Sequence, residues 1–176
     1  MKYLIMTEGT CEKALLDVLL EKNILLYKPS DLLYETVFKA RQLEHSLISK
    51  INQLPATEKV SIIRIGDKLS DELRIPRDLK KRIASIEKIC IKPEFEILHI
   101  IYQDKFSQYN KQKSNNKPCE FIYSIMCDYK KTHEFNYEFF SRLSDEELVS
   151  LLKEYDKKRL GTHKNCEKSM TTIIKK

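Results

Sequence analysis

Apolar and amphipathic segments alternate along the first half of the chain. Residues 2–7 and 59–65 are rich in aliphatic and β-branched side chains and predict two buried strands. Residues 11–22 carry apolar side chains at helical spacing, and Thr10 is placed to cap the helix that they predict. A strand, a tight turn and a helix in this order indicate an α/β fold with a mainly parallel sheet.

Two further strands complete the predicted sheet. The second strand lies within residues 32–38 or, alternatively, within residues 24–27, because periodicity does not choose between these segments. The other elements predicted in this half are a helix over residues 41–53, a helix over residues 76–84 that begins at Pro76, and a fourth strand over residues 86–91.

Beyond Pro93 the apolar periodicity is helical, and no strand pattern recurs. Ser144 and Glu147 are spaced as a capping box, which marks the start of a helix. The polar segment 108–117 is typical of a loop or mobile linker. The helices predicted in this half cover residues 94–106, 118–129, 137–142, 144–158 and 163–174.

The length and composition limit the class of protein. A chain of 176 residues, 41% hydrophobic, accommodates one sizeable core. We therefore expect an α/β domain over residues 1–106, with a four-stranded sheet flanked by helices, and a helical extension over residues 107–176 that packs on it. Apolar runs fall far short of the roughly 18 residues of a membrane span, the amino terminus has no signal-peptide pattern, and the five cysteines form no close pairs. These features predict a cytoplasmic protein.

Acidic side chains follow three of the predicted strands where each strand ends. Glu8 follows the first strand and Asp67 the third, each beside one of only three glycines, and Glu94 and Glu96 follow the fourth. The carboxyl ends of parallel strands share one edge of a sheet, where ligands bind. Carboxylate oxygens suit Mg²⁺ or Mn²⁺. Alternatively, these acids are ordinary helix starts, which capping and the helix dipole favour.

Three segments resemble the motifs of Toprim domains. Residues 4–13 (LIMTEGTCEK) resemble the opening strand, Glu-Gly turn and helix of that family. Residues 62–67 (IIRIGD) are similar to the strand that leads into its Asp-x-Asp motif. Residues 91–99, in which Pro93 is followed by Glu94, Phe95 and Glu96, resemble the Pro-x-x-Glu segment of Toprim proteins of the RloB and OLD-nuclease type. The resemblance covers about residues 1–105.

The resemblance implies metal-dependent cleavage of nucleic-acid phosphodiester bonds, in many such proteins as part of phage defence. It implies a Toprim-like fold with Mg or Mn as cofactor. The family's second aspartate falls on Leu69, so an alternative is a catalytically inactive Toprim-like module that binds nucleic acid or a larger protein partner. Carried over to this chain, the resemblance places proton transfer on Glu8 and metal binding on Asp67. Because one strand-end carboxylate alone holds a divalent ion weakly, we expect nearby acids to complete the site. The predicted catalytic residues are therefore Glu8, Asp67 and Glu94, and the predicted metal ligands are Asp67, Glu96 and Asp71.

Basic and aromatic residues suggest the same substrate. The net charge is +6, and Tyr102, Tyr109 and Tyr123 would stack on bases if they are exposed. The alternatives are solvated helix faces for the basic residues and core positions for the tyrosines. The predicted nucleic-acid-binding residues are Arg74, Arg77, Lys80, Lys81 and Lys92.

Other chemistry has weaker support. His99 is one helical turn beyond Glu96 and is a candidate acid or base, although a surface or capped histidine is the commoner case. With three glycines the chain has no phosphate-binding Gly-rich loop, and it has no Gly-x-Ser-x-Gly motif or Cys-x-x-Cys pair. A nucleoside triphosphatase, a serine hydrolase or a zinc finger is therefore disfavoured.

Overall fold

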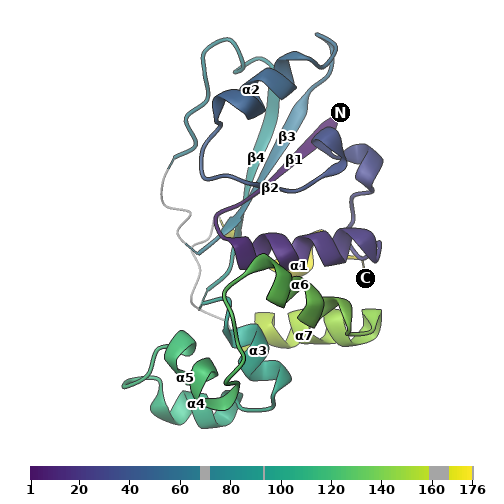
Figure 1. Ribbon diagram of the computed structural model, residues 1–176. Helices are drawn as coiled ribbons and strands as arrows, with labels where there is room; N and C mark the ends of the chain where they lie inside the picture. Colours follow the sequence, from purple (N-terminus) through teal and green to yellow (C-terminus); the bar gives the residue numbers. More distant parts are fainter. Residues whose placement is uncertain (68–71, 93, 159–166, 176) are drawn as a thin grey trace.

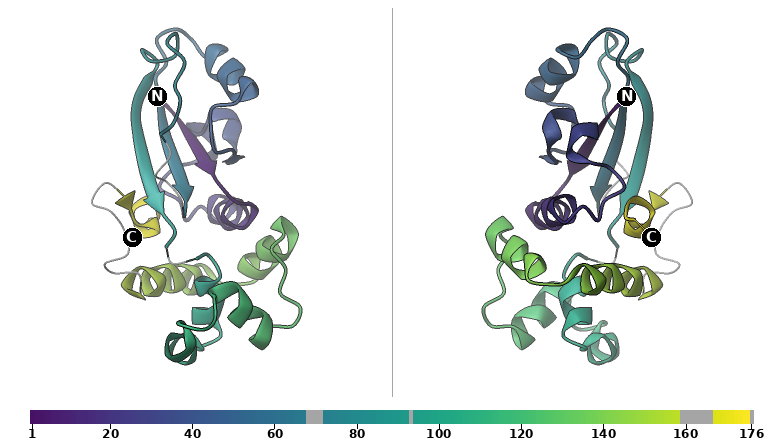
Figure 2. Two further views of the ribbon diagram at one scale, coloured as in Figure 1. Left: turned by 90° about the vertical axis from the view of Figure 1, so that its left-hand side faces the viewer. Right: turned by 90° about the vertical axis from the view of Figure 1, so that its right-hand side faces the viewer.

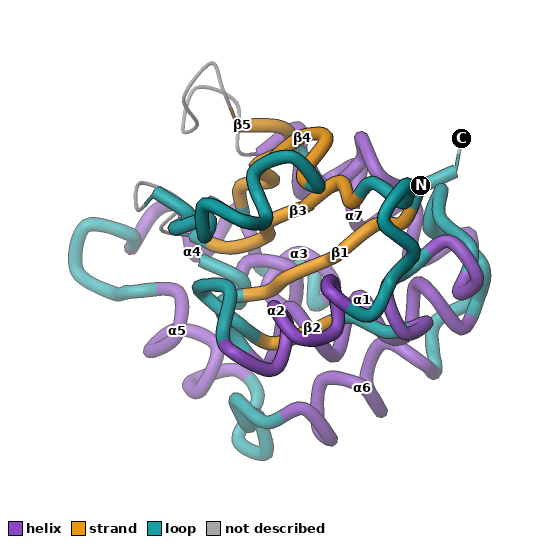
Figure 3. Tube along the Cα trace, turned by 90° about the horizontal axis from the view of Figure 1, so that it is seen from above, coloured by secondary structure: helices purple, strands orange, loops and turns teal. Residues whose placement is uncertain are grey.

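The computed structural model describes residues 1–67, 72–92, 94–158 and 167–175. It has an α/β architecture with a parallel sheet flanked by helices, as predicted (Figure 1). Four strands form the sheet in the order β2-β1-β3-β4, and the short β5 adds to β4 (Figure 3). Their bounds are β1 Lys2–Thr7, β2 Phe38–Lys39, β3 Val60–Gly66, β4 Ile83–Cys90 and β5 Glu167–Lys168.

Both faces of the central strands are buried, which explains why their sequences are continuously apolar. On β1, Ile5 faces the core shared with helix α1 (Thr10–Glu21), whereas Leu4 faces the core shared with helix α2 (His45–Asn52). On β3, Ile63 faces the core shared with α1, and Ile62 faces the core shared with α2. Adjacent side chains on a strand point to opposite faces, so the two helices cover opposite sides of the sheet.

The carboxyl-terminal region is largely helical and lies below the carboxyl ends of the strands (Figures 1 and 2). Helix α6 packs on α1, and α7 packs on α3. One hydrophobic core continues from the sheet into these helices and includes Ile89, Phe140 and Tyr155. The helices are α3 Ile97–Tyr102, α4 Phe106–Gln112, α5 Pro118–Ile125, α6 His133–Ser141 and α7 Asp145–Lys158. None of the helices described is long and apolar enough to span a membrane.

The last described residues bind back to the segment that follows α1. Leu25 and Ile174 form an isolated antiparallel bridge. The Leu26 amide donates to the Ile173 carbonyl at 2.9 Å, and the Lys175 amide donates to the Ile24 carbonyl at 2.8 Å. The chain thus closes on itself beside α1 after the short 3₁₀ helix Met170–Ile173.

Several predicted elements are confirmed with small changes. The first, third and fourth strands are present, and the Ser144–Glu147 capping box forms in both directions, at 2.7 and 3.2 Å. Gly9, and not Thr10, is the residue that precedes α1. The second strand is only Phe38–Lys39. Each of the two alternative segments contributes an isolated bridge, through Leu32 and Leu25 respectively.

The prediction of a helix over residues 76–84 is wrong. A turn occupies this segment, with Leu79 donating to the Pro76 carbonyl at 3.1 Å, and β4 begins at Ile83. Ile75, Leu79 and Ile83 are four residues apart, which imitates a helix. Pairing of Ile83 with Val60 of β3 overrides this local pattern because it extends the sheet.

Two predictions in the carboxyl-terminal region also need correction. The predicted loop 108–117 begins inside α4, which is anchored by the buried Tyr109. Part of the helix predicted over residues 163–174 lies outside the described residues, and its remainder is β5 followed by a 3₁₀ helix. Strand β5 pairs with β4 through Lys88 and Ile89, so a strand does recur after Pro93.

Candidate functional site

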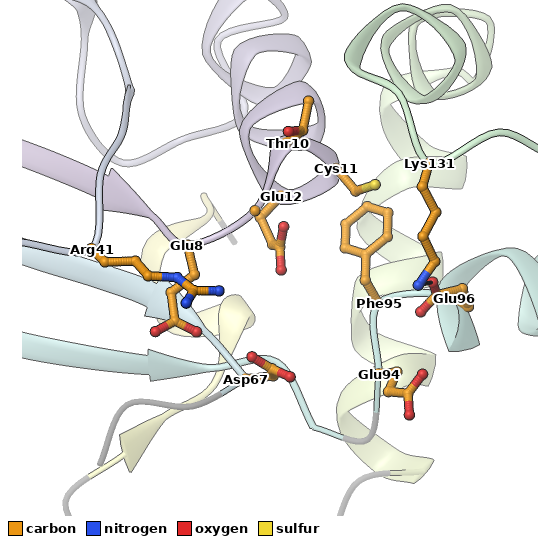
Figure 4. A pocket seen from close by; sticks show the side chains of 11 residues that line it. Glu8, Thr10, Cys11, Glu12, Arg41, Asp67, Glu94, Phe95, Glu96 and Lys131 are labelled. Atoms are coloured by element: carbon orange, nitrogen blue, oxygen red, sulfur yellow. Dashed lines mark ion pairs between the residues drawn. The ribbon is translucent and has the colours of Figure 1, made fainter. Parts of the chain in front are cut away.

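The candidate site lies where the strand order reverses, outside the carboxyl ends of β1 and β3. The chain leaves β1 toward β2 on one side and returns to β3 on the other, which is the usual ligand position in open α/β sheets. A pocket of about 300 Å³ opens there (Figure 4). It is lined by Glu8, Gly9, Thr10, Cys11, Glu12, Arg41, Asp67, Glu94, Phe95, Glu96 and Lys131.

Two glycines make room for two of these carboxylates. A Cβ atom on Gly66 would lie 2.5 Å from Cγ of Glu8, and a Cβ atom on Gly9 would overlap the Glu12 carboxylate. The Glu8 amide donates to the Ile65 carbonyl at 3.0 Å, which holds the end of β1 against β3. A side chain at either glycine would therefore displace an acid that lines the pocket.

Burial and neighbouring carboxylates raise the pKa of two acids in the pocket, Glu12 and Glu94. Burial is the main cause of the raised pKa of Glu12, and the charges of Asp67 and Glu8 add to it. The pKa of Glu94 is raised by burial first and then by Glu96 and Asp67. Because like charges oppose ionisation, this end of the pocket favours a bound cation or a proton.

Glu96 has a direct partner within the site. It is buried, and its carboxylate forms an ion pair with Nζ of Lys131, whose side chain is 47% exposed (Figure 4). Burial lowers the pKa of Lys131, but the hydrogen bond and the charge of Glu96, together with Cys119, outweigh burial, so the pKa is raised. Lys131 lies before α6 and Glu96 directly before α3, so this pair joins the starts of these two helices.

A second positively charged side chain, that of Arg41, reaches the pocket from the side opposite Lys131 (Figure 4). Arg41 follows β2 and lines both the pocket and an adjoining hollow, which it shares with Glu8. Figure 4 shows its guanidinium group extending toward Glu8. The buried Arg64 of β3 donates from its guanidinium group to the Arg41 carbonyl at 3.3 Å and so holds this turn.

The thiol in the pocket is poorly suited to nucleophilic chemistry. Burial, with the charges of Glu12 and Glu96, raises the pKa of Cys11 to about 12. Its Sγ accepts a hydrogen bond from Nδ2 of Asn136 at 3.4 Å. A thiol that stays protonated at neutral pH is a weak nucleophile, so Cys11 acts as a packing residue between α1 and α6.

The structure brings four of the predicted site residues together in one pocket. Glu8, Asp67, Glu94 and Glu96 line one pocket. Asp71 and the position of the missing second aspartate, Leu69, lie outside the described residues.

His99 does not line this pocket. It is fully buried, and its Nε2 lies 2.8 Å from Oδ1 of Asn136. Burial lowers its pKa to about 4, against the effect of the Asn136 hydrogen bond. The ring packs against Phe139 and Phe140, with centroid distances of 4.4 and 5.3 Å. A neutral, enclosed imidazole of this kind fits a core position.

The predicted basic residues are divided between the two edges of the sheet. Lys92 follows β4 at the carboxyl edge, and the amide of Arg74 donates to Oε1 of Gln42, which lines the hollow beside Glu8. Arg77, Lys80 and Lys81 lie in the turn before β4, at the amino edge and away from the pocket.

Three charged residues of the pocket, Glu12, Arg41 and Lys131, were not predicted as site residues. Glu12 is one helical turn beyond Glu8, so the helix predicted from residue 11 contained a usable signal. Arg41 follows the two-residue β2, and the strand predicted over residues 32–38 ended too early to indicate it. Lys131 reaches the site through the packing of the helical region and has no local signal.

The pocket offers carboxylate oxygens of the kind that bind hard metal ions. Among the described residues, no group of three or more His, Cys, Asp or Glu side chains is arranged as a complete metal site. Mg²⁺ is often held by one or two carboxylates together with substrate phosphates and water. Asp67 and Glu94 supply oxygen donors of this kind in a region of crowded negative charge.

Comparisons with protein-family models, with curated proteins and with solved structures gave no match to this chain.

Proposed function

We propose that this protein is a metal-dependent enzyme that cleaves nucleic-acid phosphodiester bonds. One observation carries the proposal: Glu8 and Asp67 end adjacent parallel strands at the switch point, and Gly66 leaves room for the Glu8 carboxylate between them. The residues that resemble Toprim motifs are the ones that meet in this pocket. A setting in phage defence rests on the same resemblance and is part of the proposal.

The side chains of the pocket have complementary tasks in this proposal. Glu8 gives or takes the proton at the scissile phosphodiester, as general acid–base catalysis requires. Arg41 and Lys131 stand on either side of the acids and meet the substrate phosphate. Glu96 holds Lys131 in place through their ion pair.

Asp67 and Glu94 are the residues that would hold Mg²⁺ or Mn²⁺. When bound, such an ion would polarise the phosphodiester and offset negative charge on it. Burial first, and then the charges of Glu96 and Asp67, raise the pKa of Glu94, and a cation bound there would offset part of the cost of ionising it.

The test combines a thermal shift with a cleavage assay. We expect Mn²⁺ to raise the melting temperature of the wild type and Asp67→Asn to abolish this shift, since a ligand at about 100 times its Kd stabilises by about 2.7 kcal/mol. With labelled single-stranded and duplex DNA and RNA, Glu8→Gln should lower the cleavage rate by about 10²- to 10⁴-fold. Asp78→Asn is the matched control, because Asp78 is exposed in the turn at the amino edge.

A catalytically inactive binding module is the second candidate. It is favoured by Leu69 at the position of the second aspartate and by the lack of a complete three-ligand group among the described residues. Binding of nucleic acid in EDTA, without cleavage in Mn²⁺ or Mg²⁺, would support this candidate against the enzyme.

A further inference from the structure

The helical region carries a concentration of positive charge next to the pocket. Between residues 105 and 131 there are six lysines and only two acids, Glu120 and Asp128. All six lysines are exposed. We call the exposed lysines and tyrosine on and around helices α4 and α5 the α4–α5 surface: Lys105, Lys111, Lys113, Lys117, Tyr123, Lys130 and Lys131.

An exposed aromatic ring lies on this surface. Tyr123 of α5 is 46% exposed, and its ring makes an edge-to-face contact with the buried Tyr129, with centroids 5.4 Å apart. Tyr129 therefore fixes the ring without covering it. Tyr109, by contrast, is buried against Phe121 and is inaccessible for stacking.

The α4–α5 surface begins at the edge of the pocket. Lys131 lines the pocket itself. Lys117, which precedes α5, lies close enough to Glu94 to act on the pKa of that carboxyl. From there the chain of α4 and α5 extends to the end of the molecule farthest from α2 (Figures 1 and 2).

We propose that the α4–α5 surface binds single-stranded nucleic acid as it leaves the pocket. Lys117 and Lys113 contact phosphates, and the ring of Tyr123 stacks on an unpaired base. Exposed lysines combined with an exposed aromatic ring are the means by which proteins hold single strands, whereas a duplex keeps its bases stacked on each other. The inference takes the class of substrate, nucleic acid, from the proposed function. It adds that the bound nucleic acid is single-stranded.

The experiment measures binding alone. Fluorescence anisotropy would follow the full chain with labelled oligo(dT) and oligo(U) of about 16 nucleotides, the upper site size of small single-strand-binding folds, and with a duplex of equal length, all in EDTA. Tyr123→Ala should weaken single-strand binding about tenfold, and Tyr123→Phe should retain it. Lys113→Ala with Lys117→Ala should lower the slope of log affinity against log salt by about 0.7 for each phosphate that is no longer neutralised.

Matched controls come from the opposite end of the molecule. Tyr34 is 47% exposed and lies against Lys50, so Tyr34→Ala removes an equally exposed ring. Lys80→Ala with Lys81→Ala removes two exposed lysines from the amino edge. Both controls should bind like the wild type, and melting temperatures would verify that every variant is folded.

Either DNA or RNA single strands bound in this pattern would support the inference. Duplex binding as tight as single-strand binding, or equal losses in the controls and the α4–α5 variants, would overturn it. Because the assay contains no divalent metal and measures no cleavage, absence of enzyme activity would contradict the proposed function and leave this result standing.

Discussion

Charged side chains have different partners at the two edges of the sheet. At the amino edge, cations donate to backbone carbonyls: Nζ of Lys2 to Ser30 at 2.6 Å, and a guanidinium nitrogen of Arg82 to Leu54 and Pro55 at 2.8 and 2.7 Å. At the carboxyl edge, carboxylates lie close together, and burial followed by the neighbouring negative charges raises the pKa of Glu12 and Glu94. The first arrangement fixes loops, whereas the second stores electrostatic repulsion that a ligand can relieve. Crowding of like charge thus distinguishes the candidate site from ordinary surface.

The largest effect on folding is expected at the pair that bridges the carboxyl edge. Lys131→Met would leave the Glu96 carboxylate buried without its ion-pair partner and should lower the free energy of unfolding by about 3 kcal/mol. Urea denaturation would measure it. Lys130→Met removes the adjacent exposed lysine and should change stability by less than about 0.5 kcal/mol. Equal losses of unfolding free energy in the two variants would contradict a stabilising role for the Lys131–Glu96 ion pair.

A smaller loss is expected at the amino edge. Arg82→Ala removes the hydrogen bonds to Leu54 and Pro55 and should lower the free energy of unfolding by about 2 kcal/mol. The Mn²⁺-induced thermal shift should remain as in the wild type, since the two edges are separate. Arg77→Ala, in the same turn, is the control. Loss of the Mn²⁺ response in the Arg82 variant would contradict the division between the edges.

The smallest effect is a gain in stability that depends on pH. The raised pKa of Glu12 means that the folded protein binds a proton more tightly there than the unfolded chain does. This contribution is present below the unfolded pKa, near 4.5, and is lost as pH rises through the folded pKa. Glu12→Gln should therefore be about 1 kcal/mol more stable than the wild type at pH 7, a usual size for one substitution, and no more stable at about pH 4.

Thermal denaturation across this pH range would measure the difference, with the exposed Glu72→Gln as control. A gain that stayed constant with pH would mean that packing, and not ionisation, explains it.

The part of the fold that could be predicted is the part whose signal is local. Strands β1 and β3 are buried on both faces, so they appear as continuous apolar runs, and both end beside a glycine that precedes or follows an acid. That pattern is sufficient to indicate Glu8 and Asp67 as site residues, and the pocket contains both.

The remainder depends on contacts between distant segments. Strands β2 and β5 have two residues each, so they contribute backbone pairing and almost no apolar pattern. Arg41 was missed with β2 for this reason. Lys131 reaches Glu96 through the packing of α6 on α1 and the contact of Asn136 of α6 with His99 of α3, and no spacing in its own segment indicates this.

The bridge between Leu25 and Ile174 bears on the order of folding. It joins segments separated by almost the whole chain, and closure over so long a separation costs more entropy than the local steps that form β1, α1 and β3. The native contacts are therefore completed only when both ends have come together. The pocket uses side chains from residues 8 to 131, so its acids can be assembled before this final closure.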